Sequence, residues 1–222
     1  MMIKGLIFDL DGVLVDTVPT HFAAWSRMFS EYGYDFDKTK YRELVDGRLR
    51  LDGARAILVD ADDRTVEEAA TKKNDYYLDA IDRGEFTIFE PAVQCVKKYA
   101  ADGYRLAAAS SSANVRHILE QAGLLQFFDV VVGGNDVALG KPHPEIFLKA
   151  AEGMGLSPHE CIVVEDAQSG VAAAKAGGFF CYGLVHDGDE ADLSLADQII
   201  RSLDEIDLDQ ISRITGNPVA GD

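Results

Sequence analysis

Asp9-Leu10-Asp11-Gly12 follows directly on an apolar run over residues 3–8, which the pattern predicts to be a buried strand. Two carboxylates placed two residues apart at the end of a strand form a small acidic pocket. Such a pocket either binds a hard cation or carries out carboxylate chemistry. A calcium loop is excluded, because it needs glycine at its sixth position and glutamate at its twelfth, where this chain has Leu14 and Thr20.

The composition restricts the classes of partner. A chain of 222 residues is long enough for one large domain, or for a core with a smaller insert. The formal net charge of −17 argues against a nucleic-acid partner, since binding to a phosphate backbone relies on lysine and arginine patches. A phosphorylated substrate would need positive charge supplied locally, by a metal and a few placed basic side chains.

The start of the chain and its cysteines indicate a cytoplasmic protein. Asp9 and Asp11 interrupt the apolar start too early for a signal peptide, and no run approaches the ~18 apolar residues of a membrane helix. The three cysteines, Cys95, Cys161 and Cys181, have no Cys-x-x-Cys spacing and are expected to be buried thiols in a reducing compartment. We therefore expect no membrane partner.

Strands and helices alternate regularly in the last two thirds of the chain. Strands are predicted over residues 104–109, 129–132, 161–164 and 179–185, with a short edge strand over residues 198–200. Helices are predicted over residues 91–102, 114–122, 144–154 and 169–176. Together with the first strand, this order predicts an α/β fold, a doubly wound, mostly parallel, Rossmann-like sheet.

The segment between the first strand and this alternation shows helical periods only. Phe22, Trp25, Phe29 and Tyr32 mark one helix face before Gly33, and further helices are predicted over residues 41–59 and 66–82. We interpret this segment as an inserted all-helical cap domain of residues 16–88. The catalytic core would then be discontinuous, made of residues 1–15 and 89–222.

Polar side chains gather at the predicted strand ends. Open parallel sheets bind ligands beyond the carboxyl ends of their strands. The residues at those ends are Asp9, Asp11, Ser110, Lys141, Glu165 and Asp166. This set matches phosphoryl transfer, in which carboxylates hold Mg²⁺, a lysine and a serine grip the phosphoryl oxygens, and one carboxylate attacks phosphorus. The clustered carboxylates favour a cation, because like charges at ~4 Å repel by roughly 4 kcal/mol at an effective dielectric near 20.

Four motifs in this order and spacing carry a family resemblance: Asp9-x-Asp11, Ser110, Lys141 and Glu165-Asp166. The chain resembles the haloacid dehalogenase-type phosphotransferases over essentially its whole length. The resemblance implies that Asp9 is the nucleophile and Asp11 the general acid/base. It also implies one Mg²⁺ per chain, bound by the Asp9 carboxylate, the Asp11 backbone carbonyl and Asp166, with Glu165 assisting.

A second set of residues resembles the β-phosphoglucomutase-like subfamily: His21, Trp25, Gly47, Arg50, Lys73, Asn74, Ser112 and Asn114. The resemblance implies that His21 couples cap closure to Asp11. It implies that Arg50, Ser112 and Asn114 hold a non-reacting phosphate. Lys73 and Asn74 would then touch the sugar.

Two features leave the assignment of cap residues open. Spacing alone does not decide between Arg48 and Arg50, or between Lys72 and Lys73. Ala113 also stands where the subfamily usually has a lysine beside the second phosphate, and Leu51-Asp52 where a pair of acidic residues is common. The lost lysine weakens the argument for a bisphosphate.

The sequence therefore predicts Mg²⁺-dependent phosphoryl transfer on a small sugar phosphate through an aspartyl phosphate on Asp9. We expect β-phosphoglucomutase-like isomerisation by a monomer. The alternative is a sugar-phosphate phosphatase of the same subfamily, in which Asp11 activates water. A remote alternative is a non-catalytic phospho-receiver module, although typical receivers are shorter and lack a helical cap.

Overall fold

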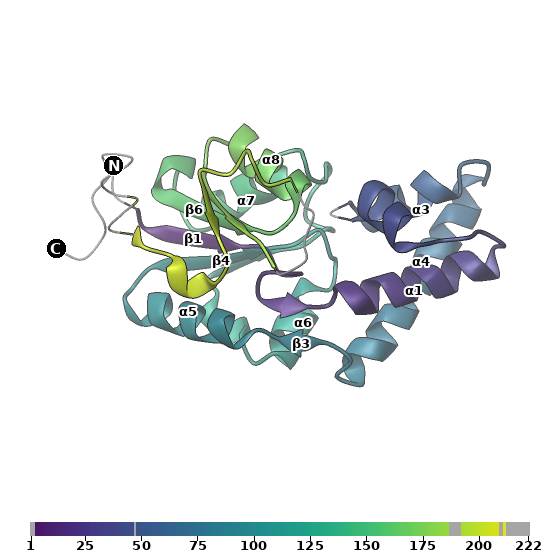
Figure 1. Ribbon diagram of the computed structural model, residues 1–222, viewed down its shortest axis with the longest axis horizontal. Coiled ribbons are helices and arrows are strands. Elements are labelled where there is room, and N and C mark those ends of the chain that lie inside the picture. The colour runs from purple at the N-terminus through teal and green to yellow at the C-terminus, as the bar shows by residue number, and fades with distance from the viewer. Residues whose placement is uncertain (1–2, 47, 187–191, 209–210, 212–222) are drawn as a thin grey trace.

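The computed structural model of the protein describes residues 3–46, 48–186, 192–208 and 211. A six-stranded sheet lies at its centre (Figure 1). In spatial order the strands are β5 (Val130–Val132), β4 (Arg105–Ala109), β1 (Gly5–Phe8), β6 (Cys161–Glu165), β7 (Phe180–Leu184) and β8 (Gln198–Ile200). All neighbouring strands are parallel. Phe8, the last residue of β1, is level with Ala108 of β4 and Val164 of β6, so these three strands end at one edge.

Helices cover both faces of this sheet (Figure 1). One face carries α5 (Glu90–Ala101) and α6 (Val115–Gln121), and the other carries α7 (Glu145–Gly153) and α8 (Gln168–Ala176). Alternation along β1 explains the two layers, because Leu6 and Phe8 pack with α5 and α6 while Ile7 packs with α7 and α8. Single turns of 3-10 helix occur at η2 (Leu125–Phe127), η3 (Pro158–Glu160) and η4 (Leu203–Glu205). The three cysteines are buried free thiols, as predicted.

A helical block lies beyond the carboxyl edge of the sheet (Figure 1). It consists of α1 (Val18–Glu31), α2 (Lys38–Lys40), the π-helical turn η1 (Tyr41–Val45), α3 (Arg50–Ile57) and α4 (Asp63–Asp82). The block has an apolar core of its own, built around Trp25, Met28, Phe29, Val66 and Ala69. Among the described residues, no helix of this block or of the rest has the length and apolar content to cross a membrane.

The prediction of one helix over residues 41–59 is wrong. Helical structure stops at Val45 and resumes at Arg50, and Asp46 and Leu49 have extended backbones between the two pieces. Asp and Gly are poor helix formers, and the Asp46-Gly47 pair stands at this break. Leu49, in this break, packs against the core loops that contain Gly134 and Gly140.

Two smaller differences concern the ends of the helical block. The connections to the sheet form a two-stranded antiparallel ribbon, β2 (Val15–Asp16) with β3 (Thr87–Ile88), which the sequence analysis did not predict. Helix α4 begins at residue 63 rather than 66, because the Asp62 side chain accepts a hydrogen bond from the Thr65 amide and caps the helix.

Candidate active site

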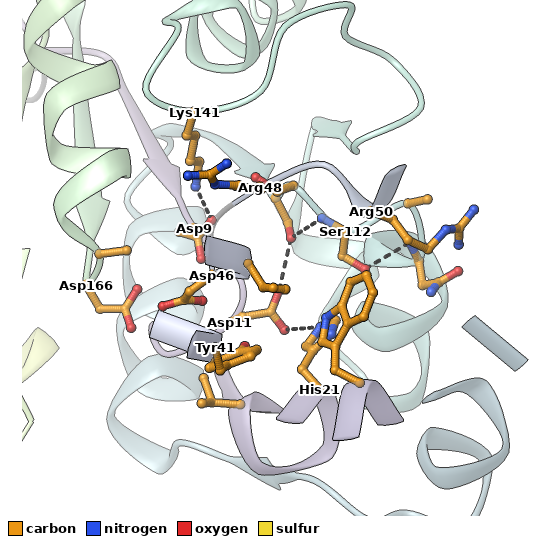
Figure 2. Close-up of a pocket in the computed structure, with 18 of the residues that line it drawn as sticks. Asp9, Asp11, His21, Tyr41, Asp46, Arg48, Arg50, Ser112, Lys141 and Asp166 are labelled. Atoms are coloured by element: carbon orange, nitrogen blue, oxygen red, sulfur yellow. Dashed lines mark hydrogen bonds and ion pairs between the residues drawn. The ribbon is translucent and has the colours of Figure 1, made fainter. Parts of the chain in front are cut away.

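The pocket between the sheet edge and the helical block collects the predicted residues (Figure 2). Those that line it are Asp9, Asp11, His21, Trp25, Arg50, Lys73, Asn74, Ser110, Ser112, Asn114, Lys141, Glu165 and Asp166. Gly47, the remaining predicted residue, lies outside the described residues. Residues as far apart in the chain as Asp9 and Asp166 are therefore neighbours, because several parallel strands and their connecting loops end at the same place.

Lys141 joins two carboxylates at the base of the pocket. Its Nζ lies 2.5 Å from Asp9 Oδ1 and also donates to Glu165 Oε1. All three residues are less than a tenth exposed. Burial opposes the charge on Lys141, but Asp9 and Glu165 outweigh it and raise its pKa, so Lys141 is a cation.

Glu165 is fixed from the other side by the backbone. Its Oε2 accepts from the Ala167 amide at 2.8 Å, and a Cβ at Gly170 would overlap its carboxylate. The side chain thus faces Lys141, and this structure gives it the geometry of a residue that holds the lysine in place.

Asp11 accepts hydrogen bonds from two hydroxyls. Ser110 Oγ donates to Asp11 Oδ2 at 3.1 Å, and Thr17 Oγ1 donates to Asp11 Oδ1. His21 Nε2 lies 3.6 Å from the same Oδ1. Burial opposes ionisation, but these contacts outweigh it and lower the pKa of Asp11, so it is a carboxylate. Sequence reasoning missed Thr17; its place immediately before a predicted helix, six residues after Asp11, was the available signal.

His21 and Lys73 form a buried pair in the helical block. Lys73 Nζ lies 2.7 Å from His21 Nδ1, and the His21 ring stacks on Tyr77 with centroids 4.0 Å apart. Burial, aided by the charge of Arg50, lowers the pKa of Lys73 to about 7. Lys72 instead points to the outer surface and pairs with Glu31, so the structure places Lys73 in the pocket.

The end of the pocket away from Asp9 is also polar. Asn114 Nδ2 donates to Asn74 Oδ1 at 2.8 Å, which joins the sheet side of the pocket to α4. Ser112 Oγ accepts from the Asn114 amide at 3.2 Å. Among the described residues, Arg50 Nε is buried without a hydrogen-bond partner. Such an unsatisfied donor is costly unless a ligand engages it.

The two arginines left open by the sequence occupy opposite ends of the pocket. Figure 2 shows Arg50 beside Ser112, and Arg48 near Lys141 and Asp9. Arg50 begins α3, whereas Arg48 lies two residues before it and its amide donates to the Val45 carbonyl at 3.1 Å. The structure thus gives each arginine a different set of neighbours.

Asp9 and Asp166 are the carboxylates that suit a cation. Burial raises the pKa of both, and Glu165 adds repulsion to both. A Cβ at Gly12, whose φ is 85°, would overlap the Asp166 carboxylate, so glycine lets the Asp11-Gly12 backbone approach it.

The donor set fits Mg²⁺ better than a closed metal site. No three His, Cys, Asp or Glu ligands converge anywhere in the described ranges. Mg²⁺ keeps several waters and is held through one or two carboxylates, whereas structural zinc takes four protein ligands. Asp9 and Asp166, whose negative charges are only partly compensated by nearby cations, lie next to the Asp11 backbone carbonyl and meet that requirement.

Comparisons with known proteins show which family the sequence and the fold match. A family model described as haloacid dehalogenase-like hydrolase matches residues 3–178. The chain is 35% identical over 206 residues to a β-phosphoglucomutase of Mycobacterium bovis, covering 80% of this chain and 79% of the relative. It is 34% identical over 188 residues to the fructose-1-phosphate phosphatase of Escherichia coli, covering 78% and 92%. A crystal structure of β-phosphoglucomutase from Clostridium difficile matches with a TM-score of 0.87 at 28% identity, covering 96% of each chain.

Proposed function

Because the chain belongs to the haloacid dehalogenase-like hydrolase family, we propose that it transfers the phosphoryl group of a sugar phosphate through an aspartyl phosphate on Asp9. The family and the α/β fold predicted from the sequence are confirmed, and the chain is an enzyme of this family. The proposal of a sugar phosphate is supported by the similarity to a phosphoglucomutase and to a fructose-1-phosphate phosphatase.

Asp9 is the proposed nucleophile. It directly follows β1, and Lys141 fixes one of its oxygens at 2.5 Å. Lys141 and Ser110 would then bind phosphoryl oxygens, with Glu165 holding the lysine. The residues that would hold Mg²⁺ are Asp9, Asp166 and the Asp11 carbonyl, and when bound the ion neutralises charge on the phosphoryl group.

Asp11 is the proposed general acid and base. Its lowered pKa leaves it ionised, so it can accept the proton of an attacking hydroxyl. In the reverse step it returns that proton to the leaving oxygen. His21, 3.6 Å away and paired with Lys73, orients this carboxylate from the helical block.

The second polar end of the pocket is the observation that supports a mutase. A sugar bisphosphate intermediate must be held at one phosphate while the other reacts. Arg50, Ser112 and Asn114 stand at the end away from Asp9, and the unsatisfied Arg50 Nε lacks an acceptor that such a phosphate would supply. Trp25, Lys73 and Asn74 line the space between, where we propose the sugar binds.

We propose the same division into domains as the sequence suggested, a cap of residues 16–88 on a core of residues 1–15 and 89–222. A closed cap would exclude water from the aspartyl phosphate, which a mutase needs. One chain supplies all the residues of the proposed site, so the proposal requires only a monomer.

Ala113 favours the second candidate, a sugar-phosphate phosphatase. It lines the pocket beside Ser112, where a lysine would add a cation for the second phosphate. With fewer cations at that end, a monophosphate would suffice as substrate, and water activated by Asp11 would hydrolyse the aspartyl phosphate.

One experiment separates these functions. The protein is incubated with Mg²⁺ and β-glucose 1-phosphate, with and without a glucose bisphosphate, and both glucose 6-phosphate and free phosphate are measured. A mutase yields glucose 6-phosphate, depends on the bisphosphate and releases little phosphate. A phosphatase releases phosphate without it. Phosphorylation of Asp9 without either product would support the receiver alternative.

A further inference from the structure

Leu49, which lies between η1 and α3, packs against the core. A Cβ built on Gly140 would lie 3.0 Å from Leu49 Cγ, and one built on Gly134 would lie 3.3 Å from Leu49 Cδ2. Leu49 therefore occupies a slot between two loops of the core, at positions where both core residues lack a side chain. A larger residue at 140 would press on Leu49 first, whereas a Cβ at 134 would also overlap the Ser111 carbonyl.

This anchor determines where the neighbouring arginines go. Leu49 has an extended backbone, with φ −61° and ψ 145°, and separates Arg48, whose amide donates to the Val45 carbonyl, from Arg50, the first residue of α3. Arg50 accordingly lies at the Ser112 end, and Arg48 lies at the end that contains Asp9 and Lys141 (Figure 2).

The end of the pocket that contains Asp9 has little uncompensated positive charge apart from Arg48. Lys141 is shared between Asp9 and Glu165, so much of its charge is already compensated there. Within the part of the chain that the structure describes, the Arg48 guanidinium makes no ion pair and no hydrogen bond, while its backbone amide is fixed by the Val45 carbonyl at 3.1 Å. Arg48 is also exposed at the opening toward the outer groove between the helical block and the core.

We propose that Arg48 binds the transferring phosphoryl group itself, while Arg50 serves the non-reacting phosphate; this rests on the proposed function. A guanidinium offers a planar fork of donors that matches two phosphoryl oxygens. Because Arg48 belongs to the helical block, its guanidinium would compensate the negative charge of the phosphoryl group only while Leu49 is packed against Gly134 and Gly140. Substrates with one phosphate would therefore depend on Arg48 as much as substrates with two.

Three arginine variants test this assignment. Arg48→Ala and Arg50→Ala are compared with Arg55→Ala, which removes the same charge from the rim of the outer groove, where Arg55 pairs with Asp63 at 2.9 Å. Release of p-nitrophenol from p-nitrophenyl phosphate reports phosphoryl transfer to Asp9 whatever follows. We expect Arg48→Ala to lower its kcat/KM about tenfold or more, Arg50→Ala to lower it less than Arg48→Ala does, and the control Arg55→Ala to leave it within about twofold.

A binding measurement keeps the test independent of turnover. Titration of the Mg²⁺-loaded proteins with orthovanadate should give a Kd about tenfold weaker for Arg48→Ala, a smaller change for Arg50→Ala, and an unchanged Kd for the control Arg55→Ala. Arg48→Lys should recover part of the loss, and equal melting temperatures would exclude a folding defect.

Two outcomes are distinguishable. If Arg48→Ala behaves like Arg55→Ala in both measurements, Arg48 does not bind the phosphoryl group and the inference is overturned. If the wild-type protein releases no p-nitrophenol and forms no aspartyl phosphate, the proposed function fails, while the vanadate titration still decides whether Arg48 binds a phosphate-like anion.

Discussion

The sheet side of the pocket and the helical side are built in different ways. On the sheet side, Asp9, Lys141 and Glu165 are less than a tenth exposed and bonded to one another. On the helical side, Arg48 is exposed and Arg50 Nε is unsatisfied in the described structure. These three groups of the sheet side are thus bonded to one another, whereas the Arg48 guanidinium and the Arg50 Nε have donors that no described residue accepts. We propose that the sheet side carries out the chemistry and that the helical side selects the substrate.

The largest expected effect tests the sheet side at its centre. Asp9→Asn keeps the size of the side chain but removes the nucleophile, so turnover of sugar and aryl phosphates should fall equally, by roughly 10⁴-fold or more. Trapping of the phosphorylated protein by acid quench and mass spectrometry should fail as well. Substantial residual turnover with a native circular dichroism spectrum would remove Asp9 from that role.

The second largest expected effect comes from substitution of a proposed Mg²⁺ ligand. Asp166→Asn should weaken Mg²⁺ binding by roughly 10–100-fold or more and lower activity on every substrate in parallel. Calorimetric titration with Mg²⁺ checks the affinity directly. An unchanged Mg²⁺ dependence of the rate would contradict the assignment.

Asp166→Asn lowers activity, but in the absence of metal it should make the folded protein more stable. Burial and the charge of Glu165 raise the pKa of Asp166, so the folded protein binds more protons than the unfolded chain above the ordinary pKa of 3.8. Ionised Asp166 therefore costs stability near pH 7 in the absence of a cation. In excess EDTA at that pH, Asp166→Asn should melt at a higher temperature than the wild type, and excess Mg²⁺ should reverse the order.

The two sides also differ in how far the sequence predicted them. Strand ends follow from apolar runs and the parallel topology, so Asp9, Ser110 and the Glu165-Asp166 pair were placed correctly at one edge. The helical side depends on a break at residues 46–49 inside a segment that reads as one helix. Periodicity does not reveal such a break, because tertiary contact of Leu49 with two glycine loops helps to define it.

The third effect is confined to the helical side. If the substrate is held at both ends, Arg50→Ala removes a charge-assisted contact worth roughly 1.5–3 kcal/mol, and kcat/KM for the sugar phosphate should fall about tenfold or more. Hydrolysis of p-nitrophenyl phosphate should barely change. Ala113 makes the effect larger, since fewer cations share the task. Equal losses on both substrates would indicate a structural role for Arg50 and favour the phosphatase.

The smallest effect is a change in pH dependence at Lys73. Burial lowers the pKa of this lysine to about 7, so in the free enzyme its proton is lost as the pH rises through that value. The pH dependence of kcat/KM reports groups of the free enzyme. We therefore expect kcat/KM for the sugar phosphate to decline above about pH 7 in the wild type, and that decline to be absent in Lys73→Gln, which should be several-fold less active at pH 6 and nearly equal at pH 8.5.

Lys72→Gln is the matched control. Lys72 points outward and pairs with Glu31, so this variant should keep the wild-type pH profile of kcat/KM.

The free energy of unfolding supplies a second readout, and the sign of its pH dependence can be derived. Between pH 7 and the ordinary lysine pKa of 10.5, the unfolded chain binds more protons than the folded protein, so the free energy of unfolding gains a contribution that rises with pH. Lys73→Gln lacks this contribution, and its stability relative to the wild type should therefore fall as the pH rises through that window. If both glutamine variants keep the decline in kcat/KM, the group that titrates is not Lys73, and the buried His21–Lys73 pair would orient Asp11 without presenting an ammonium group to the sugar.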